Sequence, residues 1–143
     1  MNVFRKVYED IHDAVKLVNR VGLVGIDQVG QLGRIENLWT VESVTNQLIE
    51  QNDAETTYQR LYVLNGYFDM DEWDPETMGK IDDWVDRVQA TIHALPGTDA
   101  TDGRIDAYWA KDVSITSAAG GEQRDQPHQL AQISIEVHLR KTR

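Results

Sequence analysis

The sequence predicts an α+β fold, a two-layer sandwich in which two helices lie on one face of a mixed sheet of about four strands, in the order α-β-β-α-β-β. Two segments repeat apolar residues every three or four positions, as amphipathic helices do. A third segment, over 131–139, alternates apolar and polar residues as a half-buried strand does. No internal repeat or long linker divides the 143 residues, so we expect a single domain over 1–143.

The two helices are predicted from their apolar stripes and their end signals. The first covers roughly 3–19, with the stripe Phe4, Val7, Ile11, Val15 and Val18. The second covers roughly 75–95; Asp74 is suited to cap it and Pro75 to occupy its first position. Pro96 and Gly97 end this helix, whose stripe comprises Met78, Ile81, Val85, Val88, Ile92 and Leu95.

Four strands are predicted over 35–48, 57–68, 105–117 and the run that follows Gln129. The third is interrupted near Lys111 and Asp112, and the fourth places every second residue in the core. Residues 98–104 are predicted to form a turn. Segments 20–34, 45–56 and 118–129 are rich in glycine or polar residues, and we expect extended loops there. The predicted buried set is Phe4, Val7, Ile11, Ile81, Val85, Val88, Ile133, Ile135 and Val137.

Composition excludes several classes of protein. The net charge is −10, from 24 acidic and 14 basic residues, and such a chain repels phosphate. The acidity suits an ordinary acidic soluble protein, a surface that lets DNA slide past, or adaptation to high salt. The chain has no cysteine, which excludes a disulfide framework and a thiolate zinc site. No apolar run approaches the roughly 18 residues of a membrane span, so we expect no membrane partner.

No catalytic template fits the sequence. G-x-S-x-G is absent, and no lysine stands where a phosphate-binding loop requires one. The four histidines, His12, His93, His128 and His138, fall on different predicted elements. The acidic residues Asp69, Asp71, Glu72 and Asp74 precede a helix, where acids are favoured by capping and by the helix dipole. We therefore expect no catalytic residue, no cofactor and no metal.

Large aromatic side chains are more numerous than one small core needs, and surplus aromatics often lie at protein interfaces. The basic run at 140–143 either contacts an acidic neighbour or is a solvated tail. The candidate interface residues are Trp39, Tyr62, Tyr67, Trp73, Trp109, Arg124, Arg140 and Lys141.

The whole pattern resembles the small tail-terminator and tail-completion proteins of long-tailed, siphovirus-like viruses of bacteria and archaea. The matching stretches are NVFRKVYEDIHDAVKLV, TTYQRLYVLNGYF and PETMGKIDDWVDRVQATIHAL, followed by the closing alternation ISIEVHL. They cover nearly all of the chain. That family shares architecture and periodicity rather than an invariant signature, so the resemblance assigns no catalytic residue.

The resemblance implies a structural virion protein that forms a homo-oligomeric ring, usually a hexamer, on the finished tail tube. Its partners would be the major tail tube protein and a head-completion or neck protein. Genomic DNA would pass through the lumen without sequence-specific binding. The protein would lie in the virion, at the tail or neck, and in the host cytoplasm during assembly.

Three alternatives remain open at this point. A head-closure or neck connector protein of the same particle would share the acidity and the ring symmetry but have different neighbours. A small α+β ligand-binding domain or enzyme would need a pocket with converging polar groups. An ordinary interaction module would form a dimer.

Overall fold

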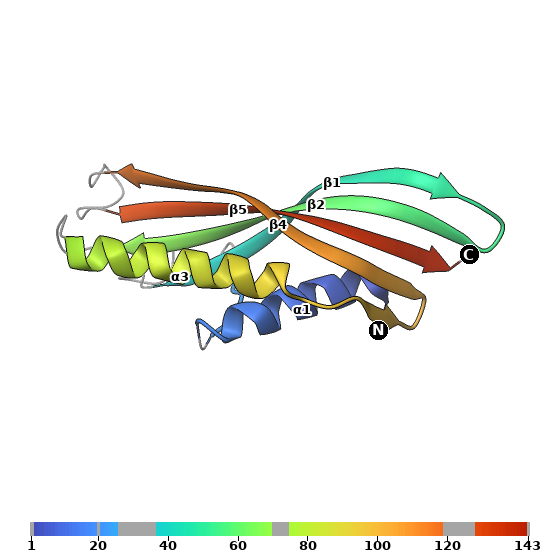
Figure 1. Ribbon diagram of the computed structural model, residues 1–143, viewed down its shortest axis with the longest axis horizontal. Coiled ribbons are helices and arrows are strands. Elements are labelled where there is room, and N and C mark those ends of the chain that lie inside the picture. Colours follow the sequence, from blue (N-terminus) through green and yellow to red (C-terminus); the bar gives the residue numbers. More distant parts are fainter. Residues whose placement is uncertain (1, 20, 26–36, 70–74, 119–127, 143) are drawn as a thin grey trace.

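The protein forms one five-stranded antiparallel sheet with two helices on the same face (Figure 1). The structure, a computed structural model, describes residues 2–19, 21–25, 37–69, 75–118 and 128–142. The strand order is β1-β2-β5-β4-β3. Along the chain the elements are α1 (Val3–Lys16), β1 (Leu38–Gln51), β2 (Glu55–Asp69), α3 (Pro75–His93), β3 (Thr98–Ala100), β4 (Gly103–Ala118) and β5 (His128–Thr142).

The predicted four-stranded mixed sheet is wrong in both strand number and strand direction. The segment predicted as a turn contains β3, which pairs with Gly103–Ile105 of β4, so the order is α-β-β-α-β-β-β. A polar strand of three residues is too short to show alternation. β5 lies between β2 and β4 and runs antiparallel to both, and the β1–β2 and β3–β4 pairs are antiparallel as well, so the sheet is antiparallel throughout.

The predicted loop 45–56 is also wrong, because β1 and β2 continue through it as a hairpin that pairs as far as Gln51 and Thr56. Only 52–54 form the turn. There the Asn52 side-chain oxygen accepts the N–H groups of Ala54 and Glu55 at 2.8 and 2.9 Å. Residues 42–54, which we call the outer arm, are all exposed. The predicted strand 35–48 covers the first part of this arm, but the polar residues 50–54 beyond it have no apolar alternation, which is why a loop was predicted there.

The remaining predicted loops lie largely outside the described residues. Of 20–34, the described residues are 21–25, where Leu23 forms an isolated parallel bridge with Trp39. Of 118–129, the two ends belong to β4 and β5. The predicted interruption near Lys111 is a β-bulge, because the register of β4 on β5 shifts between Ala110 and Val113.

The core lies between the helices and the sheet, as amphipathic elements require. Every member of the predicted buried set is buried except Phe4, which is half-buried and packs against the core. Alternate residues of β5 from Ala131 to Leu139 face the helices. Core residues from other elements include Val3, Ala14, Val15, Trp39, Tyr62, Leu64, Phe68, Ile92, Ile105 and Tyr108.

Asp102, in the turn between β3 and β4, joins three parts of the chain. Its Oδ1 accepts the N–H of Val3 at 2.7 Å, and its carbonyl accepts the N–H of Thr142 at 2.8 Å. Asn2 caps α1 by accepting the Arg5 N–H at 2.8 Å. These bonds fix the start of α1 against the sheet next to the end of β5.

Candidate interaction surfaces

Two of the predicted interface residues, Trp39 and Tyr62, are fully buried in the core. The Trp39 ring meets Phe68 edge-on at 5.6 Å, and Tyr62 meets Tyr8 edge-on at 5.4 Å. Burial raises the pKa of Tyr62 to about 12. Both residues alternate onto the helix-facing side of their strands, so the prediction that they contact a neighbouring subunit is corrected.

The other described candidates lie at or near the surface. Tyr67 packs beside Leu38, and Trp109 is 44% exposed. Arg140 donates to both carboxylate oxygens of Asp106, at 2.8 and 2.9 Å, so its guanidinium is engaged within the chain. Lys141 lies 5.4 Å from the centre of the Phe4 ring. Trp73 and Arg124 lie outside the described residues.

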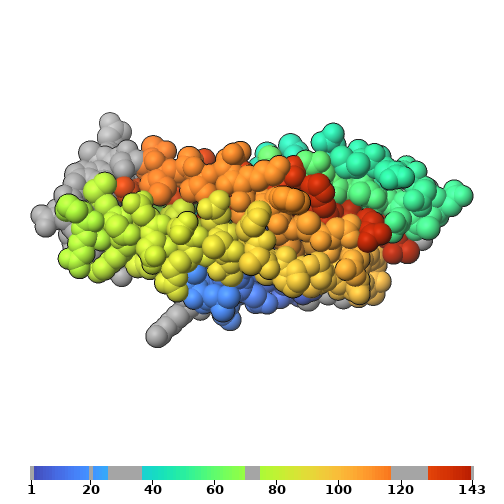
Figure 2. All heavy atoms as spheres, viewed as in Figure 1, coloured from blue at the N-terminus to red at the C-terminus, as the bar shows by residue number. Residues whose placement is uncertain are grey.

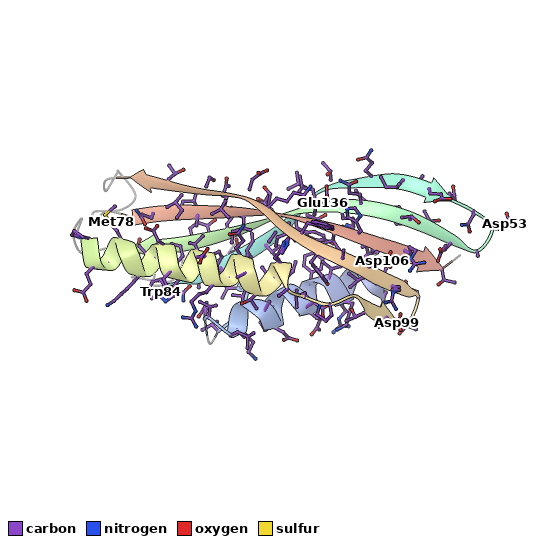
Figure 3. The ribbon with its side chains drawn as sticks, viewed as in Figure 1. Asp53, Met78, Trp84, Asp99, Asp106 and Glu136 are labelled. Carbon is purple, nitrogen blue, oxygen red and sulfur yellow. The ribbon has the colours of Figure 1, made fainter. Side chains whose placement is uncertain are left out.

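Glu136 is the centre of a polar cluster on the face of the sheet away from the helices (Figure 3). Its carboxylate accepts a hydrogen bond from Gln59, pairs with Lys111 at 2.9 Å and lies 3.1 Å from His138. The hydrogen bond from Lys111, more than the opposing effect of burial, lowers the pKa of Glu136 below its ordinary value of 4.5. The cluster joins β2, β4 and β5 and leaves this carboxylate with partners on three sides.

Replacing Glu136 by glutamine is expected to reduce stability most at neutral pH. The pKa of Glu136 is lower in the folded chain than in the unfolded chain. The ionised carboxylate therefore contributes fully to the free energy of unfolding above its unfolded-state pKa, and this contribution is lost as the pH falls through the folded-state pKa. We expect a difference of about 1 kcal/mol near pH 7 that shrinks as the pH falls and Glu136 becomes protonated. Urea unfolding between pH 3 and 7 measures it, with E50Q on the exposed arm as the control. A difference that does not change with pH would contradict this role.

Asp10 is a buried acid that links α1 to the sheet. Its carboxylate accepts hydrogen bonds from Lys6 at 2.6 Å, Tyr108 at 2.8 Å and Thr98 at 3.5 Å. Burial, and then the bond to Asp10, raise the pKa of Tyr108, and the same carboxylate raises that of Lys6. The sequence analysis missed this group, although an acid beside the apolar stripe of the first helix was a usable signal. Three donors satisfy the buried carboxylate, which indicates a structural role.

Replacing Tyr108 by phenylalanine is expected to destabilise the fold by about 1–3 kcal/mol, because it removes one donor from a buried carboxylate. Urea unfolding gives the free-energy difference. Tyr67→Phe is the matched control, since Tyr67 is half-buried on the opposite face, and it should cost less than about 0.5 kcal/mol. Equal losses in the two variants would show that the bond to Asp10 contributes nothing.

A hollow of about 410 Å³ lies beside α1 and is lined by Arg5, Tyr8, Glu9, His12 and Leu23. Its polar groups already interact with one another or with backbone. His12 Nδ1 accepts the N–H of Leu23 at 3.0 Å, and Arg5 lies 3.8 Å from Glu9. The hollow is large enough for a small ligand, and it brings four ionisable side chains of α1 to one place.

The exposed large hydrophobic side chains are concentrated on two strands. Eight are found in the described part of the chain, and six of them lie on β1 or β4. β1 is the edge strand on one side of the sheet. On the other side the edge strand is β3, but it is so short that most of β4 also lies at the edge. Figure 2 shows both strands at the surface. The six are Val44, Leu48, Ile49, Trp109, Val113 and Ile115, between 37% and 52% exposed.

Trp109 also brings two histidines together, because its ring lies 6.0 Å from that of His93 and 6.3 Å from that of His138. These residues come from α3, β4 and β5, so their spacing in the sequence gave no sign of the contact. Among the described residues, no group of three or more histidines and acids is placed to hold a metal ion. Of the acidic cluster before α3, Asp69 is buried and the other three residues lie outside the described part.

Comparison with protein-family models and with curated proteins finds no match to this chain. No helix in the described part is long and apolar enough to cross a membrane.

Proposed function

We propose that this chain is a structural virion protein, a tail terminator that forms a ring on the end of the tail tube and docks the tube to the head and neck. One observation carries the proposal beyond the resemblance: the exposed apolar side chains gather on the two opposite borders of one sheet. A ring built head to tail needs two different contact surfaces on each copy, and opposite borders provide them.

The charge of the chain fits this function. A hexamer would carry about −60 before counterions bind, so a DNA molecule in its lumen would not be gripped. Asp82, Asp83 and Asp86 are exposed on α3 and contribute to this field. Repulsion between copies should weaken as salt rises from low to moderate concentration, because salt screens exposed charges.

The test is whether the purified chain forms rings and whether the rings cap tubes. Sedimentation and electron microscopy across a salt series should show rings that become more abundant with added salt. Rings added to a growing preparation of the tail tube protein should appear at one tube end and stop its extension. A chain that stays monomeric both alone and with tubes would overturn the proposal. Rings that bind a head connector but no tube would favour the head-closure alternative.

A small ligand-binding domain is the second candidate, favoured by the hollow beside α1. Isothermal titration with small anionic and cationic metabolites, repeated with R5A, distinguishes a ligand-binding domain from a tail terminator. Saturable binding that R5A abolishes, in a chain that forms no ring, would favour the ligand-binding domain.

A further inference from the structure

The sheet has two strand edges with no neighbouring strand among the described residues. In the described part of the chain, β1 pairs with β2 on one side, and on the other side it meets only the isolated bridge from Leu23 to Trp39, which leaves the edge open beyond Trp39. On β4, β3 covers only Gly103–Ile105, and Gln89 of α3 donates to the carbonyls of Ala110 and Lys111 at 3.2 and 3.1 Å. Residues 112–118 therefore pair with β5 on one side, and no described strand lies on their other side. An unpaired edge is a template for a strand from another chain.

We propose that β1 of one copy pairs with residues 112–118 of β4 in a second copy, so that the sheet continues from copy to copy. This inference deepens the proposed function and rests on it for the ring. Neighbouring strands alternate in direction across the sheet. Copies repeated by rotation about an axis inclined to the strands would place β4 antiparallel to β1, which continues that alternation. The inclination also lets neighbouring copies be displaced along the strands within a closed ring.

The side chains on the two edges define a register. Leu48 opposes Tyr58 on the helix-facing side of the sheet, and Val113 opposes Ile133 on the same side. Placing Leu48 opposite Val113 brings two half-exposed apolar side chains together. Each strand has a register shift next to this position, between Leu48 and Glu50 on β1 and between Ala110 and Val113 on β4.

The same register matches charge. Glu50 then lies opposite Lys111, and both belong to the face away from the helices, where Lys111 already pairs with Glu136. β1 contains two acids, Glu42 and Glu50, and no lysine, arginine or histidine, so it favours a partner strand that carries a cation.

Charge also argues against pairing of β1 with β1 of a second copy. A two-fold arrangement that sets Val44 opposite Leu48 would set Glu42 opposite Glu50, and like charges directly opposite each other destabilise a strand pair. The head-to-tail arrangement avoids this repulsion and can repeat until a ring closes.

The experiment uses the absence of cysteine in the natural chain. In the variant L48C/V113C, β2 and β5 lie between the two cysteines of one chain. Three strand spacings separate them by about 14 Å, twice the reach of a disulfide of about 7 Å, so any disulfide joins two copies. After mild oxidation we expect a ladder of covalent oligomers that ends at the ring.

The controls separate the alternatives. L48C and V113C alone should give only background cross-linking, and so should D83C/A90C on the exposed side of α3. A dimer from L48C alone would show two-fold pairing of β1 and overturn the inference. Charge reversal is the second measurement: E50K should weaken assembly about two- to fivefold at low salt, whereas D53K, which makes the same change of charge in the exposed turn of the hairpin, should not.

Failure of this inference can be told apart from failure of the proposed function. A cross-linked ring that never caps a tube supports the strand pairing and rejects the terminator. Caps formed by L48C/V113C without cross-links support the terminator and reject the pairing.

Discussion

Substituting Val88 by aspartate is expected to leave the chain without a stable fold. Val88 is fully buried on α3, in line with Ile81, Val85 and Ile92. An unpaired carboxylate at this position costs several kcal/mol, against a total stability of about 5–15 kcal/mol for a typical domain. Circular dichroism should show loss of the cooperative thermal transition.

Ala90→Asp is the matched control for this variant, because Ala90 is exposed on the same helix. It introduces the same charge and loses more helix propensity than V88D does, because alanine is the best helix former, and it should still change stability by only about 1 kcal/mol. A soluble V88D protein with a sharp melting transition would mean that α3 does not pack on the sheet through this face.

Replacing Trp39 by alanine is expected to have the next largest effect, a loss of about 3–5 kcal/mol. Trp39 packs against Phe68, which in turn stacks on Trp84 at 5.8 Å. Gly66 leaves room for the indole, since a Cβ there would lie 2.8 Å from it. Removing the ring opens a large cavity beneath α3. Urea unfolding gives the change in the free energy of unfolding.

Trp109→Ala provides the comparison, because Trp109 is a tryptophan at the surface of the same sheet. It should cost about half as much as W39A or less, since Trp109 is 44% exposed and its removal leaves no enclosed cavity. If W109A were as costly as W39A, the assignment of Trp39 to the core and Trp109 to the surface would be wrong.

The helices could be predicted because their signal is local. The first was expected over 3–19 and is Val3–Lys16; the second was expected over 75–95 and is Pro75–His93. In each, a stripe at the helical period coincides with the face that packs on the sheet. The end of β1 beyond residue 48 gave no such signal, because an exposed strand needs no apolar face. β3 forms only because Gly103–Ile105 lies beside it.

The polar clusters around Asp10 and Glu136 depend on contacts between residues far apart in the sequence, which one sequence does not reveal. Asp10 meets Tyr108 across 98 positions of sequence, and Gln59 meets Glu136 across 77. Aromatic content predicted interfaces but not which side of a strand each ring occupies. Trp39 and Tyr62 fall on the side covered by helices, whereas Trp109 lies on β4 at the border, and these placements follow from pairing rather than from composition.

The position of β5 has a consequence for how the protein is made. β5 is the central strand of the sheet and the last strand along the chain (Figure 1). On the ribosome, the β1–β2 and β3–β4 hairpins emerge before the strand that joins them, each with an apolar face and open edges. Such nascent hairpins can pair wrongly with other chains, and their correct pairing awaits distant residues, which slows folding. Release of β5 therefore unites the two halves and completes the sheet.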